Sequence, residues 1–179
     1  MSTIAQKLDA GTYKLDPVHS HVSFAVSYLG GTFRGSFAPV DGVLEVSEDG
    51  SISLNGSTKA ENVRVQEENL TGHLQSPDFF DAERAPELSF KSNEVNVDGS
   101  SVTVKGDLSI KGAAKPVELK GSLGEPLTDA YGNERVGLKL TGSIDRTAFG
   151  IEWNNPLPSG EPALANDVTL ESELFFVKS

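Results

Sequence analysis

Three histidines are the residues best suited to catalysis or metal binding in this chain of 179 residues. His19 and His21 are separated by one residue, so along a strand both side chains would point the same way, as in a His-x-His metal site. No further histidine or acidic residue continues that spacing, so we expect both to lie on a polar face and to donate hydrogen bonds to neighbouring backbone. His73 stands alone and is expected to be exposed or to cap a helix. The sequence therefore predicts no metal site.

Motifs for nucleophilic or phosphate chemistry are missing from the sequence. It contains no Gly-x-Ser-x-Gly turn that would present a catalytic serine, no phosphate-binding loop and no dinucleotide fingerprint. Asp78, Asp81 and Glu83 cluster, but carboxylates beside a helix N-terminus more often stabilise the positive end of that helix. Because there is no cysteine, there is no thiolate nucleophile or metal ligand either. We expect a protein that is not an enzyme and needs no cofactor.

The chain is strongly acidic. Its formal net charge is −11 and its isoelectric point is about 4.6, so it repels phosphate backbones and anionic membrane surfaces. We expect no nucleic-acid partner and no more than transient membrane contact. Residues 1–10 lack the apolar segment of a secretory signal peptide, and no stretch approaches the roughly 20 apolar residues of a transmembrane helix. These features predict a cytoplasmic protein and make a periplasmic or exported one less favoured.

Alternation of apolar and polar residues fills most of the chain and predicts strands. In the clearest segment, 101–110, the inward face carries Val102, Val104, Leu108 and Ile110. The same pattern recurs in residues 21–29, 33–46, 51–60, 88–97, 116–123, 136–144 and 167–177. One-sided alternation is typical of antiparallel sheets, and about eight such strands can close into a barrel. We predict an all-β, eight-stranded antiparallel barrel, with a two-sheet sandwich as the alternative.

Two details of the alternation concern the barrel wall. The inward side changes parity at Ala38-Pro39 and again between Phe90 and Val95, which predicts a bulge or bend at each place. Six glycines fall on inward positions: Gly35, Gly42, Gly56, Gly106, Gly121 and Gly142. Two explanations stay open, because inward glycines either ease the bending of a closed sheet or leave volume for a guest molecule.

The alternation stops twice, and both breaks carry aromatic residues. Residues 67–74 predict one or two helical turns, and Ser76-Pro77-Asp78 is typical of a second helix start. Phe79 and Phe80 follow, so this helical insert would serve as a lid for one barrel end or as a cap on the core. The second break, residues 147–167, is rich in proline and contains Phe149 and Trp153. We expect it to form an ordered loop across an opening.

Four blocks of the sequence resemble the YceI-like family, the polyisoprenoid-binding proteins with an extended lipocalin-like fold. They are Tyr13-Lys-Leu-Asp-Pro through Gly35-Ser-Phe37; His73-Leu-Gln-Ser-Pro-Asp-Phe-Phe-Asp81 through Phe90; residues 106–117; and Ile144-Asp-Arg-Thr-Ala-Phe-Gly150 through Trp153. The blocks follow the family's order and span residues 12–177. The chain departs from the family pattern at Thr71-Gly72, where an Arg-Asp pair is usual, and at Tyr28, where histidine is common.

The resemblance implies a single YceI-like domain over residues 11–179, which follows a flexible segment at 1–10. Its eight-stranded lipocalin-like barrel would hold a long isoprenoid-type lipid, such as a polyprenyl or quinone-like amphiphile, for transport, storage or sequestration. Inward parity and the two breaks predict ligand contacts from Phe24, Val26, Tyr28, Phe37, Phe79, Phe80, Phe90, Leu108, Leu140, Phe149, Trp153 and Leu170. Cations for a polar head group would come from Arg146, Lys115 or Arg84.

Two other functions and one partner stay open. A barrel enzyme that modifies small molecules would need polar groups inside the lumen, and an interaction module would have a filled barrel with an exposed apolar patch. Phe175 and Val177 face outward on the last predicted strand, so an exposed edge there would support a homodimer.

Overall fold

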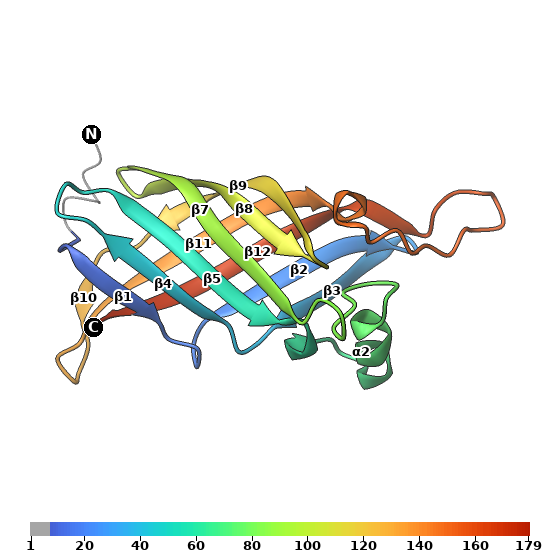
Figure 1. Ribbon diagram of the computed structural model, residues 1–179, viewed down its shortest axis with the longest axis horizontal. Coiled ribbons are helices and arrows are strands. Elements are labelled where there is room, and N and C mark those ends of the chain that lie inside the picture. The colour runs from blue at the N-terminus through green and yellow to red at the C-terminus, as the bar shows by residue number, and fades with distance from the viewer. Residues whose placement is uncertain (1–7) are drawn as a thin grey trace.

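Strands make up most of this computed structural model, which describes residues 8–179. They are β1 (Gly11–Leu15), β2 (His21–Tyr28), β3 (Gly31–Phe37), β4 (Asp41–Val46), β5 (Ile52–Lys59), β6 (Val63–Arg64), β7 (Glu87–Asp98), β8 (Ser101–Ile110), β9 (Ala113–Leu123), β10 (Leu127–Thr128), β11 (Glu134–Asp145) and β12 (Leu164–Lys178). The helices are η1 (Ala60–Asn62), α2 (Glu68–Gln75) and η2 (Arg146–Phe149). Figure 1 shows an elongated barrel with α2 at one end and the C-terminus at the other. None of the helices in this described part is long and apolar enough to span a membrane.

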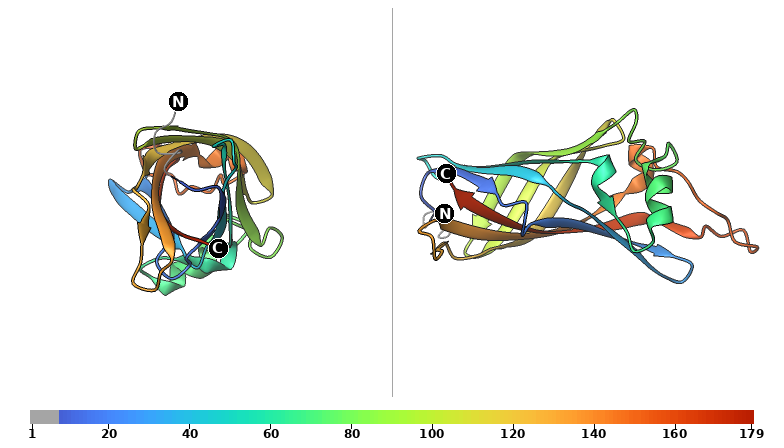
Figure 2. Two further views of the ribbon diagram at one scale, coloured as in Figure 1. Left: turned by 90° about the vertical axis from the view of Figure 1, so that its left-hand side faces the viewer. Right: turned by 90° about the horizontal axis from the view of Figure 1, so that it is seen from below.

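The strands close into an antiparallel barrel of eight strands, which confirms the predicted fold class. Around the ring lie β11, β9, β8, β7, β5, β4, β1 and β12, and β12 pairs with β11 to close it. The left view of Figure 2 looks along this barrel. β12 is long enough, at 15 residues, to pair with β1 near its C-terminal end and with β2 along the rest. β2 carries β3 and β6 beyond the ring, on the side of α2.

Both predicted bends occur. The chain leaves β3 and enters β4 through residues 38–40, which contain a cis Ala38–Pro39 peptide. Within β7, the register against β8 shifts between Ser92 and Glu94. The parity of inward residues therefore changes where the strand is interrupted or bulged, because an extra residue turns every later side chain to the opposite face.

The insert between β6 and β7 contains one helix, as predicted, but not the second. Ser76 ends α2 instead of starting a helix, and residues 76–84 form turns. The backbone N–H groups of Phe80 and Ala82 donate to the carbonyls of Leu74 and Gln75 at the end of α2. The predicted start at Ser76 is therefore wrong, because the following residues fold back to satisfy the open carbonyls of the preceding helix.

The inward glycines mostly make room for the protein's own atoms. A Cβ on Gly35 would overlap the ring of Phe24, and one on Gly106 would overlap the Lys91 carbonyl oxygen. A Cβ on Gly142 would lie 2.6 Å from Leu119 Cδ2. Gly56 differs, because its Cβ would meet only the Asp41 carbonyl oxygen, at 3.3 Å. The explanation that these glycines leave volume for a guest is therefore wrong at Gly35, Gly106 and Gly142, and holds best at Gly56.

Two apolar clusters divide the interior. The first, which we call the closed-end core, consists of Leu8, Tyr13, Leu44, Val46, Leu54, Val102, Val104, Leu123, Val136, Leu138, Leu140, Leu174 and Phe176. Tyr13 and Phe176 at its centre are fully buried, and the Tyr13 hydroxyl donates to the Asp9 carbonyl. The second cluster lies in the half of the barrel near α2. Residues 1–7 of the predicted flexible segment lie outside the described residues, whereas Leu8 packs in the closed-end core.

The last strand offers no free edge for a homodimer. β12 pairs with β11 on one side and with β1 and β2 on the other. The Phe175 N–H donates to Ser20 Oγ, and the Phe175 carbonyl accepts a hydrogen bond from the Asp16 N–H. Edge-to-edge pairing at Phe175 and Val177 was therefore a wrong expectation, because ring closure uses both edges of this strand.

A charge network joins the β1–β2 connection to β11. Arg135 Nη1 lies 3.1 Å from Asp16 Oδ2, and its Nε lies 2.6 Å from Asp129 Oδ2. His19 Nδ1 lies 2.7 Å from the same Asp16 oxygen. Hydrogen bonds from His19 and then Arg135 lower the pKa of Asp16 to about 2. The hydrogen bond from Arg135 is the main cause that lowers the pKa of Asp129 to about 2.

Replacing Arg135 by methionine should lower the melting temperature by a few degrees at pH 7 and by much less at pH 2. Both carboxyls have folded pKa values below the usual 3.8, so their stabilisation is present above that pH and is lost as the pH falls toward 2. Thermal unfolding between these pH values, followed by circular dichroism, measures the difference in melting temperature between the wild type and the variant. A difference that stays constant down to pH 2 would contradict stabilisation through the Asp16 and Asp129 carboxylates.

Candidate ligand-binding cavity

A cavity of about 300 Å³ occupies the half of the barrel near α2. Its walls are the inward side chains of the barrel strands and of β2 and β3, and its end toward α2 is formed by the insert and the loop after η2. Leu70, His73 and Leu74 of α2 line it, as do Ile151 and Trp153 of that loop. The closed-end core fills the opposite part of the barrel. Because side chains fill that opposite part, we infer that a ligand enters at the end near α2.

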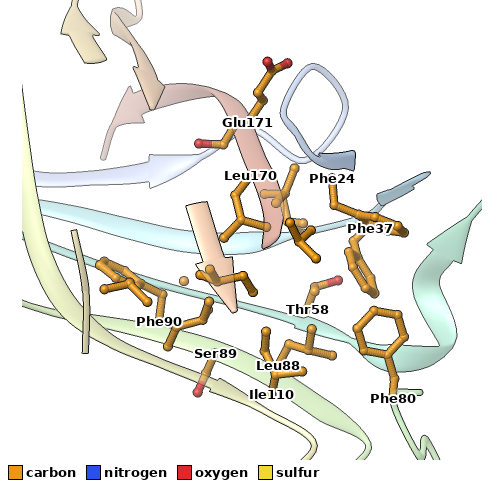
Figure 3. A pocket seen from close by; sticks show the side chains of 18 of the residues that line it. Phe24, Phe37, Thr58, Phe80, Leu88, Ser89, Phe90, Ile110, Leu170 and Glu171 are labelled. Carbon is orange, nitrogen blue, oxygen red and sulfur yellow. The ribbon is translucent and has the colours of Figure 1, made fainter. Parts of the chain in front are cut away.

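Aromatic rings form one wall of the cavity. Phe24 of β2, Phe37 of β3 and Phe80 of the insert meet there, with ring centroids 5.2 Å apart for Phe37 and Phe80 and 6.3 Å apart for Phe24 and Phe80. Figure 3 shows these three rings together and Phe90 at the other side of the space. The side chains of Glu171 and Ser89, whose residues also border the cavity, point away from it (Figure 3). The surface that faces the space is thus almost wholly apolar.

His73 lies at the end of the cavity near α2. Its ring packs edge-on against Phe79 and Trp153, with centroids 4.9 Å and 5.2 Å away. Its Nε2 lies 3.1 Å from Asp78 Oδ2. His73 thus ties α2 to the loop that carries Trp153. Sequence reasoning missed it as a cavity residue because no periodic pattern includes it.

Arg146 is the one arginine or lysine among the described residues that line the cavity, and its hydrogen-bonding capacity is nearly used. Its guanidinium donates to the carbonyls of Ile151, Trp153, Leu164 and Ala165, at 2.8–3.2 Å. These bonds take four of its five N–H groups. The residue is 4% exposed, and burial lowers the pKa of the guanidinium. Arg146 therefore holds the loop after η2 on the barrel, with one N–H left over.

Comparison with known families places this barrel. The YceI-like domain family matches residues 13–176, which is nearly the whole chain. The chain belongs to the YceI-like family. Two YceI-like relatives are the UPF0312 protein plu2095 of Photorhabdus laumondii and Protein YceI of Escherichia coli O157:H7. Each is 30% identical over 148 residues, and the alignment covers 80% of this chain with 77% of the first protein and 78% of the second.

Solved structures share the YceI-like fold. BcnA of Burkholderia cenocepacia superposes with a TM-score of 0.76 at 19% identity, over 90% of this chain and 98% of that one. A polyisoprenoid binding domain from Saccharophagus degradans, implicated in plant cell wall breakdown, gives a TM-score of 0.68 at 15% identity, over 93% and 98%. At these identities the likeness concerns the fold.

Most of the predicted ligand contacts line the cavity of this YceI-like barrel. Those that do so are Phe24, Val26, Tyr28, Phe37, Phe79, Phe80, Phe90, Leu108, Leu140, Trp153 and Leu170. Phe149 does not, because η2 turns its ring into the apolar cluster beside the cavity, where it is 3% exposed. The alternation signalled further lining residues that we did not single out, including Leu54, Leu88 and Ile110. Leu15 had no such signal, since β1 was not predicted.

The remaining predicted residues lie elsewhere. Lys115 and Arg84 are exposed and do not border the cavity, so only Arg146 of the three predicted head-group cations reaches it. His19 lies in the turn before β2 and contacts Asp16, so it shares no strand with His21 and does not donate to backbone as expected. Within residues 8–179, no group of three histidine, aspartate or glutamate side chains could hold a metal ion.

Proposed function

We propose that this YceI-like barrel binds the hydrocarbon chain of an isoprenoid-type lipid or a comparable amphiphile, for transport, storage or sequestration, without changing it chemically. The observation that supports this most is the apolar cavity of about 300 Å³ inside a closed barrel. The lining residues predicted from the sequence, from Phe24 at the aromatic wall to Leu170 of β12, would contact the chain. The polyisoprenoid binding domain from Saccharophagus degradans has the same fold, which agrees with this class of ligand.

Transfer of the chain out of water supplies the affinity. Each buried methylene contributes up to about 0.8 kcal/mol, so an isoprene unit would contribute about 3–4 kcal/mol. Ordering of the chain and competition from a lipid phase offset part of this gain. A bilayer is as apolar as the cavity, so the protein would exchange its ligand with a membrane rather than trap it.

The surroundings of the cavity favour a neutral head group. Arg146 has one N–H free, and Lys115 and Arg84 lie away from the cavity. Acidic residues Glu67 and Glu68 start α2 and Asp78 follows it, while the Lys111 ammonium beside Asp78 donates to the Pro77 and Gly150 carbonyls. A pyrophosphate head would meet these three carboxylates with Lys111 as the one cation beside them, whereas an alcohol, amide or quinone would carry no charge to be repelled.

Native mass spectrometry and organic extraction of protein purified from its source test the proposal. We expect an added mass that is removed by organic solvent and that proves to be a lipid. Recombinant protein should also bind neutral prenyl alcohols such as farnesol. Protein that carries no lipid and fails to bind prenyl alcohols would refute the proposal.

Replacing Gly56 by leucine should weaken binding of farnesol at least tenfold while the barrel stays folded. Gly56 lines the cavity and a Cβ there would meet one atom closely, the Asp41 carbonyl oxygen at 3.3 Å, so the new side chain would take the place of about four ligand carbons. Gly137→Leu is the matched control, because Gly137 lies on the outer face of β11 with no heavy atom near its Cβ position. Displacement of a fluorescent fatty-chain probe measures both. Equal affinity in the two variants would place the ligand outside the barrel.

A further inference from the structure

The cavity ends at a floor of large apolar side chains. Leu54, Leu140 and Leu174 line the cavity and also belong to the closed-end core. Phe90 and Leu119 line the cavity and pack against that core. Behind the floor the barrel is filled by side chains, so a chain that enters near α2 meets a stop inside the barrel.

Leu54 is the floor residue that has space behind it. It borders the cavity and also a second void of about 10 Å³, whose other walls include Leu44, Val104 and Leu123. Leu54 faces Leu44 across the β4–β5 pair, and the two are 5% and 2% exposed. The void is no larger than one water molecule and its lining is apolar, so it stays dry. The Leu54 side chain therefore separates two spaces that would join without it.

The cavity volume limits the chain that fits above this floor. An apolar cavity of about 150 Å³ accommodates one benzene ring, which has six carbons. By that scale the cavity of about 300 Å³ takes about 12 carbons. The floor at Leu54 is rigid, because packed interiors do not expand freely.

We infer that Leu54 sets the length of the hydrocarbon chain that this barrel encloses, at about 10–15 carbons. This inference rests on the proposed function, since it assumes that the cavity takes a lipid chain. The ligand is thus an amphiphile with two or three isoprene units, or an alkyl chain of similar length, inside the barrel. Any longer chain leaves its remaining carbons outside the entrance, where they add no burial.

A series of linear alkan-1-ols from about 8 to about 18 carbons, measured by displacement of a fluorescent probe, tests this inference. Affinity should rise about fourfold for each added methylene until the chain reaches the floor, and then level off. In Leu54→Ala, which lacks three carbons at the floor, the levelling should occur about three carbons later. Leu44→Ala is the matched control. It removes the same atoms from the facing strand, behind Leu54, and should leave the break at the wild-type length.

Other outcomes separate the two proposals. If the alcohols bind but affinity rises without a break, or if the break does not move in Leu54→Ala, the role of Leu54 is refuted while lipid binding stands. If none of the alcohols binds, the proposed function fails as well. Should Leu54→Ala not fold, Leu54→Val takes its place, and affinity should level off about one carbon later than in the wild type. No change in that chain length would refute the role of Leu54.

Discussion

Arg146→Met should destabilise the fold by about 3–5 kcal/mol, the largest effect that we expect from removing one polar side chain. Methionine fills similar space but donates no hydrogen bond, so the carbonyls of Ile151, Trp153 and Ala165 would lose the arginine donor. The Leu164 carbonyl would lose it too but would keep its hydrogen bond from Asn154 Nδ2. Each buried carbonyl left unpaired costs about 1–3 kcal/mol, and water at the entrance would recover part of that. Urea unfolding at pH 7, followed by circular dichroism, measures the change.

Two companion variants make the result specific to these hydrogen bonds. Arg146→Lys keeps the charge but has a single nitrogen, so it should recover only part of the lost stability. Arg84→Met changes an exposed arginine of the insert and should shift stability by no more than about 0.5 kcal/mol. If Arg146→Met unfolds at the wild-type urea concentration, the four carbonyl contacts do not hold the loop after η2.

Gly106→Ala should destabilise the barrel by about 3 kcal/mol, although it adds a single methyl group. The new Cβ would overlap the Lys91 carbonyl oxygen and lie 2.8 Å from Ser92 Cα, and both atoms belong to the β7 backbone. A flexible side chain could move aside, but a paired strand moves only by breaking its ladder. The register shift between Ser92 and Glu94 lies beside this contact, so the bulge and the glycine fit one another.

Gly56→Ala is the matched control for that substitution. Gly56 also faces inward, but its Cβ would meet one carbonyl oxygen, at 3.3 Å, so we expect a change of less than about 1 kcal/mol. Urea unfolding of both variants under the same conditions compares them. Similar losses in the two would mean that a general cost of replacing glycine in strands, and not contact with β7, explains the result.

Much of the fold could be predicted from the sequence because alternation records which face of each strand is buried. The segment 101–110 illustrates this, since Val102, Val104 and Ile110 all prove buried in β8. Strand β1 escaped prediction, since its five residues are too few to establish a pattern. β1 pairs with strands that lie far away in the sequence, since Tyr13 faces Leu44 of β4 and Lys178 of β12.

The candidate cavity was predictable along the strands and less so elsewhere. The alternation along the strands predicts that Phe24, Phe37 and Leu108 point inward, and all three line the cavity. It does not predict how much space lies in front of an inward position. Gly106 and Gly56 share that parity, yet a Cβ on Gly106 would overlap a backbone oxygen, whereas one on Gly56 would lie 3.3 Å from a backbone oxygen and border the cavity. Phe149 was assigned to the loop across the opening, but it belongs to the short helix η2, whose turn directs the ring into the apolar cluster beside the cavity.

The pairing of β12 with β1 has a consequence for biosynthesis. Ser20 Oγ accepts a hydrogen bond from the Phe175 N–H, 155 positions further along the sequence, and β11 also needs β12 as its partner. A ribosome releases the N-terminal strands first, so the wall stays open until the final strand emerges. Closure of the barrel therefore depends on pairing between segments far apart in the sequence, a kind of contact that forms slowly.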